Sequence, residues 1–97
     1  MEKINHPEHY QQEGKKECIW QMIEDYGKRV TAVFCLTNAY KYLYREGNKP
    51  DNSAKEDRAK AKWYLDFVDK HLFSSVQGAN TVKLYRDIRK ELKDDKG

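Results

Sequence analysis

Cysteine is scarce in this chain of 97 residues: only Cys18 and Cys35 occur, and both lie in segments with helical apolar spacing. They do not form a framework of paired cysteines, and no apolar leader segment precedes them, so we expect a reducing, cytosolic setting. Long apolar runs are also missing. No stretch approaches the roughly 20 apolar residues that a membrane-spanning helix needs, and we therefore expect no membrane partner.

The sequence lacks the common phosphate-binding and metal-binding motifs. Neither G-x-x-x-x-G-K-[ST] nor G-x-G-x-x-G occurs, so any bound nucleotide would be held by side chains rather than by a glycine-rich loop. The dense acidic cluster of magnesium-dependent helical nucleotide pyrophosphatases is absent as well. Zinc could use imidazole and thiolate donors, but none of them has C-x2-C spacing, and we expect no metal site among His6, His9, Cys18, Cys35 and His71.

No large excess of one charge sign is present, because 19 Lys and Arg residues stand against 16 Asp and Glu residues. The C-terminal run KLYRDIRKELKDDK is rich in cations, but acidic residues are interleaved with them, which is typical of a solvated helix face. A nucleic-acid partner is therefore not expected. The net charge of +3 remains compatible with a small anionic ligand.

Period-two alternation bounded by turn residues is absent, so we predict an all-α fold, a small bundle of about four helices with an extended N-terminal arm. Gly27, Gly47 and the polar segment 74–80 separate the apolar periodic segments. The expected domain organisation is an N-terminal arm at 1–15, a helical core at 16–73, and a C-terminal helix and tail at 74–97. The expected helices are 16–26, 29–46, 53–73 and 81–93.

The apolar residues of the helix at 53–73 form two stripes. Ser53 and Glu56 have the spacing of a capping box at its start. One stripe contains Ala61, Tyr64, Leu65, Val68 and Leu72, and the other contains Trp63 and Phe67. Two stripes require two partners, and in a short chain we expect the second partner to be another subunit of a homo-oligomer.

The helix at 29–46 separates apolar from polar residues when it is projected at about 100° per residue. The predicted core side carries Val33, Leu36, Tyr40, Leu43 and Tyr44. The opposite side carries Asn38, Lys41, Tyr42 and Arg45, with Lys49 just beyond the helix end. Lysine and arginine one turn apart can hold a phosphate, tyrosine offers a stacking face, and asparagine can bond to a base or sugar edge. Alternatively, Lys41 and Arg45 are surface charges that pair with acids such as Glu46.

Several short motifs follow one another in a fixed order: His6-Pro7-x-His9-Tyr10, Glu17-Cys18-Ile19, Asn38-Ala39-x-Lys41-Tyr42-x-Tyr44-Arg45-x-Gly47-x-Lys49, and Glu56-Asp57 with Lys60-Ala61 and Tyr64-Leu65. Over residues 6 to about 68 they resemble the small bacteriophage family called domain of unknown function 3310, or SaV-like. The chain departs from that pattern at Thr37, where the family usually has glycine, and at Lys15-Lys16. A similar domain forms part of the oligomeric nucleotide kinase of short-tailed coliphages, which has no Walker A loop.

The resemblance implies a phage accessory protein in the cytoplasm of the infected bacterial host. We expect it to bind a nucleotide or a nucleotide-derived signal through His6, His9, Tyr10, Asn38, Lys41, Tyr42, Arg45 and Lys49, with the N-terminal arm closing over the ligand. Three functions remain open at this point: sequestration of a host immune signal, a kinase-like phosphotransferase that acts on nucleoside monophosphates with Mg²⁺, and inhibition of a host protein through Trp63 and Phe67.

Overall fold

The computed structural model of the chain describes residues 17–46, 48 and 53–93. These residues form three α-helices, α1 (Cys18–Arg45), α2 (Ala54–Phe67) and α3 (Ala79–Lys93). A π-helical turn (Val68–Leu72) and a 3-10 turn (Phe73–Ser75) extend α2 toward α3. The described part of the chain contains no strand, which confirms the all-α prediction. The predicted arm at 1–15 lies outside the described residues.

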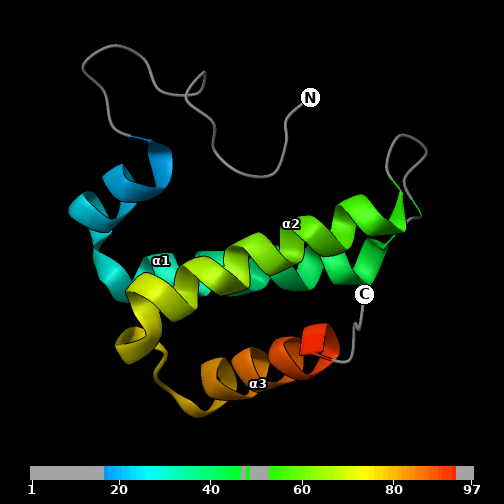
Figure 1. The fold of residues 1–97 in the computed structure, drawn as a ribbon. Coiled ribbons are helices and arrows are strands. Elements are labelled where there is room, and N and C mark those ends of the chain that lie inside the picture. Colours follow the sequence, from blue (N-terminus) through cyan, green and yellow to red (C-terminus); the bar gives the residue numbers. More distant parts are fainter. Residues whose placement is uncertain (1–16, 47, 49–52, 94–97) are drawn as a thin grey trace.

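The predicted number of four helices is wrong because Gly27 interrupts a helix and does not end it. Its backbone leaves the helical region with φ 93° and ψ 166°, and the chain resumes helical geometry at the next residue. Glycine adopts this positive φ without the steric cost that a Cβ would bring. The Thr31 hydroxyl donates a 2.9 Å hydrogen bond to the Gly27 carbonyl and so satisfies it beside the break. Figure 1 shows the consequence: the blue start of α1 is turned away from the axis of the rest of the helix.

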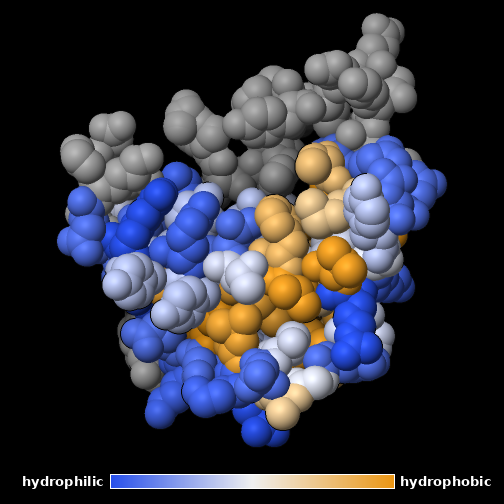
Figure 2. Space-filling model, turned by 180° about the vertical axis from the view of Figure 1, so that it is seen from behind, coloured by the Kyte–Doolittle hydropathy of each residue, from blue (hydrophilic) through white to orange (hydrophobic). Residues whose placement is uncertain are grey.

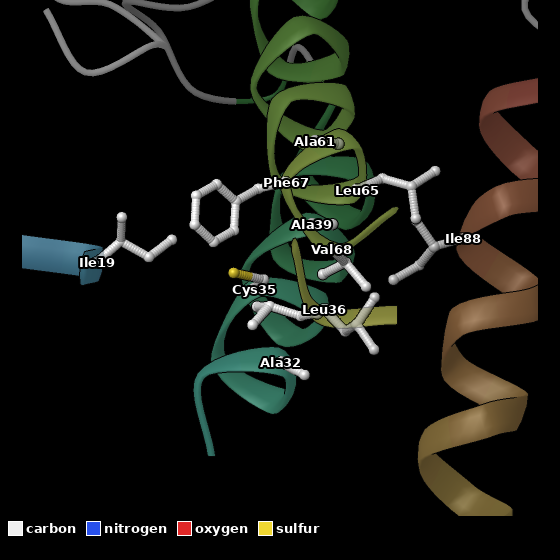
Figure 3. Close-up of a cluster of buried hydrophobic side chains, with 11 residues drawn as sticks. Ile19, Ala32, Cys35, Leu36, Ala39, Ala61, Leu65, Phe67, Val68 and Ile88 are labelled. Carbon is white, nitrogen blue, oxygen red and sulfur yellow. The ribbon is translucent and has the colours of Figure 1, made fainter. Parts of the chain in front are cut away.

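The core lies mainly between α1 and α2, which make the most extensive contact of any two elements and run side by side in Figure 1. Small side chains without exposed area form the centre of this contact, and larger aliphatic side chains surround them, as Figure 3 shows. The small residues are Ala32, Cys35, Ala39 and Ala61. Because small side chains let two helices approach closely, they decide which side of α1 is buried.

The core side predicted for this part of α1 is therefore only partly correct. Leu36 is fully buried and Leu43 is half-buried, but Val33, Tyr40 and Tyr44 are 40%, 55% and 78% exposed. The prediction assigned the side with valine and tyrosine to the core, whereas the bundle buries the face that carries alanine and cysteine.

The predictions for the start and the inner face of α2 are confirmed. The Ser53 hydroxyl accepts a hydrogen bond from the Glu56 backbone N–H, and the Glu56 carboxylate accepts one from the Ser53 backbone N–H, each at 3.1 Å. Both halves of the capping box are thus present. Of the predicted inner stripe, Ala61, Leu65, Val68 and Leu72 are buried and Tyr64 is half-buried.

Asp69 in the π turn attaches α3 to the end of α2. Its two carboxylate oxygens accept a hydrogen bond from the Tyr85 hydroxyl and one from Arg89 Nη2, each at 2.6 Å. Ile88 of α3 is 2% exposed and points toward the core, as Figure 3 shows. None of the helices in the described ranges is both long enough and apolar enough to cross a membrane.

Candidate functional site

Three cations from two helices surround the ring of Tyr42. Lys41 Nζ lies 4.6 Å from the ring centroid, Arg45 Cζ lies 5.0 Å from it, and Lys60 Nζ of α2 lies 5.4 Å from it. Each distance is within the range of a cation–π contact. We call Lys41, Arg45 and Lys60 around Tyr42 the cationic cluster. Sequence reasoning placed Lys41, Tyr42 and Arg45 together, and the structure adds Lys60.

The guanidinium of Arg45 is hydrogen-bonded to a buried carboxylate. Its Nε and Nη2 donate to Asp57 Oδ1 at 3.4 and 3.3 Å, and the Asp57 side chain has no exposed area. The alternative interpretation, in which these cations pair with an acid, therefore holds for Arg45, although the acid is Asp57. Glu46 instead accepts from Arg58 Nη1 at 3.3 Å. Asp57 thus fixes the position of the Arg45 guanidinium, while 26% of the Arg45 side chain remains exposed.

The two lysines of the cluster differ from Arg45 in this respect. Within the described ranges, neither Lys41 nor Lys60 has a carboxylate at ion-pairing distance. Two like charges near one ring repel each other unless an anion compensates them. The cluster therefore has the electrostatic character of an anion site.

Tyr42 is less open to a ligand than predicted. Its ring stacks on Tyr64 of α2, with a centroid separation of 6.2 Å and an interplanar angle of 13°. Burial, together with charge interactions with Tyr42, Cys35 and Cys18, raises the pKa of Tyr64 from 10.0 to about 12. The tyrosine pair thus joins α1 to α2 and supports the cations around it.

A concave feature lies beyond Tyr64, toward the end of α2. It is a cavity of about 290 Å³ lined by Glu17, Trp20, Trp63, Asp66, Phe67, Lys70 and His71, and we call it the aromatic pocket. Trp20 meets Phe67 and His71 edge to face at centroid distances of 5.2 and 4.9 Å. The break at Gly27 is what turns the first part of α1, and Trp20 with it, onto the end of α2.

The aromatic pocket corrects the prediction that Trp63 and Phe67 face another subunit. Phe67 is 7% exposed and stacks on Trp63 at 5.6 Å, and Trp20 of the same chain covers it. The second apolar stripe of α2 thus has an intramolecular partner. This partner could not be predicted from the sequence, because no local pattern shows that the chain bends at Gly27 and then continues as a helix.

The aromatic rings continue from the cationic cluster to the aromatic pocket. Tyr64 contacts Trp63 edge to face at 5.1 Å, and Trp63 leads to Phe67. Lys60 and Phe67 are seven residues apart on α2, which corresponds to about 10 Å along the helix axis at about 1.5 Å per residue. The two features therefore lie within reach of one ligand the size of a nucleotide.

The family comparison covers the cationic cluster. The model of a family of proteins of unknown function, DUF3310, matches residues 4–66, more than half of the chain. The chain belongs to DUF3310. No curated protein and no solved structure matches it. The DUF3310 segment includes α1 and nearly all of α2, so all four residues of the cluster lie inside it, whereas Phe67, Lys70 and His71 of the aromatic pocket lie just beyond.

The remaining predicted ligand residues are distributed as follows. Asn38 is half-buried on α1 within the DUF3310 segment. His6, His9, Tyr10 and Lys49 lie outside the described residues. Lys60 could have been found from the Lys60-Ala61 motif, since it follows the other ligand motifs in the same order. In the ranges that the structure describes, no three His, Cys, Asp or Glu side chains are grouped as metal ligands would be.

Proposed function

We propose that this DUF3310 protein binds a nucleotide or a nucleotide-derived molecule, with its phosphate at the cationic cluster and its base in the aromatic pocket. The observation that carries the proposal is the approach of Lys41 and Lys60, from different helices and without a carboxylate partner in the described residues, to the same tyrosine ring. Such a pair is suited to an anion, because the bound charge removes their mutual repulsion.

Arg45 contributes hydrogen-bond donors of fixed orientation to this site. Asp57 uses two of the five N–H donors of its guanidinium, and the others remain for a phosphate oxygen. Because Asp57 fixes the guanidinium plane, little side-chain entropy is lost when a ligand binds. Arg45 and the two lysines then share the phosphate, and Asn38 bonds to the sugar or base edge.

The aromatic pocket suits the other end of the ligand. Stacking on Trp20 or His71 accepts any heteroaromatic base, since every base has a π face. The Asp66 carboxylate lines the same pocket and can accept hydrogen bonds from the N–H groups of a base. Lys70, in the same lining, adds a cation for a phosphate or carbonyl oxygen.

The geometry favours binding over phosphoryl transfer. A kinase needs carboxylates that hold Mg²⁺ beside the phosphate. Asp57, the carboxylate bonded to the cluster, is fully buried and its Oδ1 is already bonded to Arg45. We therefore propose a phage accessory protein that sequesters a nucleotide signal in the cytoplasm of the infected host.

Isothermal titration calorimetry with a panel of mononucleotides, dinucleotides and cyclic oligonucleotides tests the proposal. The variants Lys41→Ala and Lys60→Ala should each weaken binding by about 10- to 100-fold, the value of one charge-assisted hydrogen bond of about 1.5–3 kcal/mol. Lys55→Ala is the matched control: Lys55 is five residues from Lys60 on α2, is exposed, and belongs neither to the cationic cluster nor to the lining of the aromatic pocket. It should bind as wild type does.

Mass spectrometry of the mixture distinguishes the functions. An unchanged ligand released on denaturation supports sequestration, and a new phosphorylated product formed with Mg²⁺ indicates the kinase alternative. Wild-type affinity in both Lys41→Ala and Lys60→Ala would rule out the cationic cluster as the site. Capture of a host protein with no nucleotide bound would support the inhibitor alternative.

A further inference from the structure

The outward face of α1 carries a stripe with the spacing of a coiled-coil seam. Its members are separated by three, four, three and four residues, which is the heptad pattern that keeps side chains on the line between two paired helices. All are exposed, and four are apolar or aromatic: Val30 at 53%, Val33 at 40%, Tyr40 at 55% and Tyr44 at 78%, with Thr37 at the centre. We call these five residues the α1 stripe.

The hydroxyl of Thr37, at the centre of the stripe, is hydrogen-bonded to backbone carbonyls of its own helix. The Thr37 hydroxyl lies 2.9 Å from the Val33 carbonyl and 3.1 Å from the Phe34 carbonyl, so it bonds within its own helix. Tyr40 and Tyr44 stack on each other at 6.1 Å and present one joined aromatic surface. Figure 2 views the molecule from the side opposite to that of Figure 1 and shows hydrophobic residues near the middle of the view with hydrophilic residues around them.

A hollow adjoins one end of the α1 stripe. It has a volume of about 210 Å³ and lies between α1 and α3, lined by Tyr40, Leu43, Tyr44, Asp87, Ile88 and Glu91. Its lining is apolar at Leu43 and Ile88 and acidic at Glu91, whereas the Asp87 carboxylate is already paired with Lys83 at 2.7 Å. An occupant that fits must therefore offer an apolar side chain with a cation next to it.

The other end of the same stripe offers that combination. Val30 is exposed and Arg29 precedes it. Arg29 lies on the α3 side of α1, since a Cβ built on Gly78 would be 3.9 Å from Arg29 Nη2. Within the described chain, neither the Arg29 guanidinium nor the Glu91 carboxylate has an ion-pair partner.

We infer that a second copy of this chain covers the stripe, with the two α1 helices antiparallel about a two-fold axis near Thr37. Each copy then places Val30 in the partner's hollow and Arg29 beside the partner's Glu91, so the surface is complementary to itself, as a two-fold interface requires. Parallel pairing would leave Arg29 and Glu91 at opposite ends of the interface. From Val30 to Tyr44 the seam is about 21 Å long.

Sedimentation equilibrium and light scattering of the full chain test this inference. Wild type should be a dimer, and both Val33→Glu and Tyr40→Glu should raise its dissociation constant by about tenfold or more, because each buries a carboxylate in the seam. Tyr26→Glu is the matched control, since Tyr26 is 71% exposed and precedes the Gly27 break. Circular dichroism should show unchanged helix content in all three variants, whose sites are at the surface.

Charge reversal and cross-linking test the orientation. Arg29→Glu and Glu91→Arg should each weaken the dimer, and the double variant should restore it. In a Cys18→Ser background, a mixture of Val30→Cys and Tyr44→Cys chains should form a disulfide between unlike chains on mild oxidation. A monomeric wild type, or a dimer that tolerates Val33→Glu and Tyr40→Glu, would overturn the inference. Cross-linking of Val30→Cys chains only to each other would overturn the antiparallel arrangement.

Discussion

The Arg45–Asp57 pair predicts an asymmetric response to mutation. Asp57 has no exposed side-chain area, whereas 26% of the Arg45 side chain is exposed. Replacing Arg45 by methionine keeps much of its packing but leaves a buried carboxylate without this cation. Breaking a buried pair in this way typically costs about 3–5 kcal/mol, compared with a total of about 5–15 kcal/mol for a domain. Asp57→Asn should cost less, about 1–2 kcal/mol, because the amide oxygen still accepts from Arg45 and no buried charge remains.

Urea unfolding followed by circular dichroism measures both values. With an m-value of about 1.5 kcal/mol/M, a loss of about 3 kcal/mol lowers the midpoint by about 2 M. The decisive comparison is Arg45→Met in the Asp57→Asn background, where its cost should fall by about 2 kcal/mol because the charge that it compensates is gone. An equal cost in both backgrounds would refute the argument that Arg45 stabilises the buried carboxylate.

Four further outcomes follow from the described residues. Gly27→Ala should lower the free energy of unfolding by about 1–3 kcal/mol through backbone strain alone, since no atom lies within 4 Å of the added Cβ. An unchanged free energy in urea unfolding would contradict φ 93° at this position. Leu36→Ala should cost about 2–5 kcal/mol in the same assay, because Leu36 has no exposed area. One thiol, that of exposed Cys18, should react with Ellman's reagent at pH 8 in the native protein and two in denaturant, since burial raises the pKa of Cys35 from 9.0 to about 12. The folded pKa values of Cys35 and Tyr64 are both raised to about 12, so their contribution to stability is complete below pH 9 and is lost as the pH rises toward 12. The melting temperature should therefore fall between pH 9 and pH 12. The fall should be smaller in Cys35→Ala than in wild type.

The predictions that held rest on local chemistry. The capping box at Ser53 and Glu56 depends on residues three apart, and the buried face of α2 depends on spacing along one helix. Lys41, Tyr42 and Arg45 lie close together for the same reason, since they are within one turn of each other.

What the sequence could not show are contacts between elements. Lys60 reaches Tyr42 only because α2 packs on the alanine and cysteine face of α1. That face was not predicted, since tyrosine and valine rank as better core residues than alanine. Arg45 has several acids within reach in the sequence, and only the packing of α2 selects Asp57.

The break at Gly27 also makes the number of residues between Gly27 and Trp20 important for the aromatic pocket. Six residues separate it from Trp20, and that number fixes the direction in which the indole leaves the helix. Removing one of them would rotate Trp20 by about 100° around the helix axis and carry it away from Phe67. The aromatic pocket therefore tolerates many substitutions in the first part of α1 better than it tolerates a single deletion. Insertions and deletions between these two positions should be selected against even where side-chain identity is free to vary.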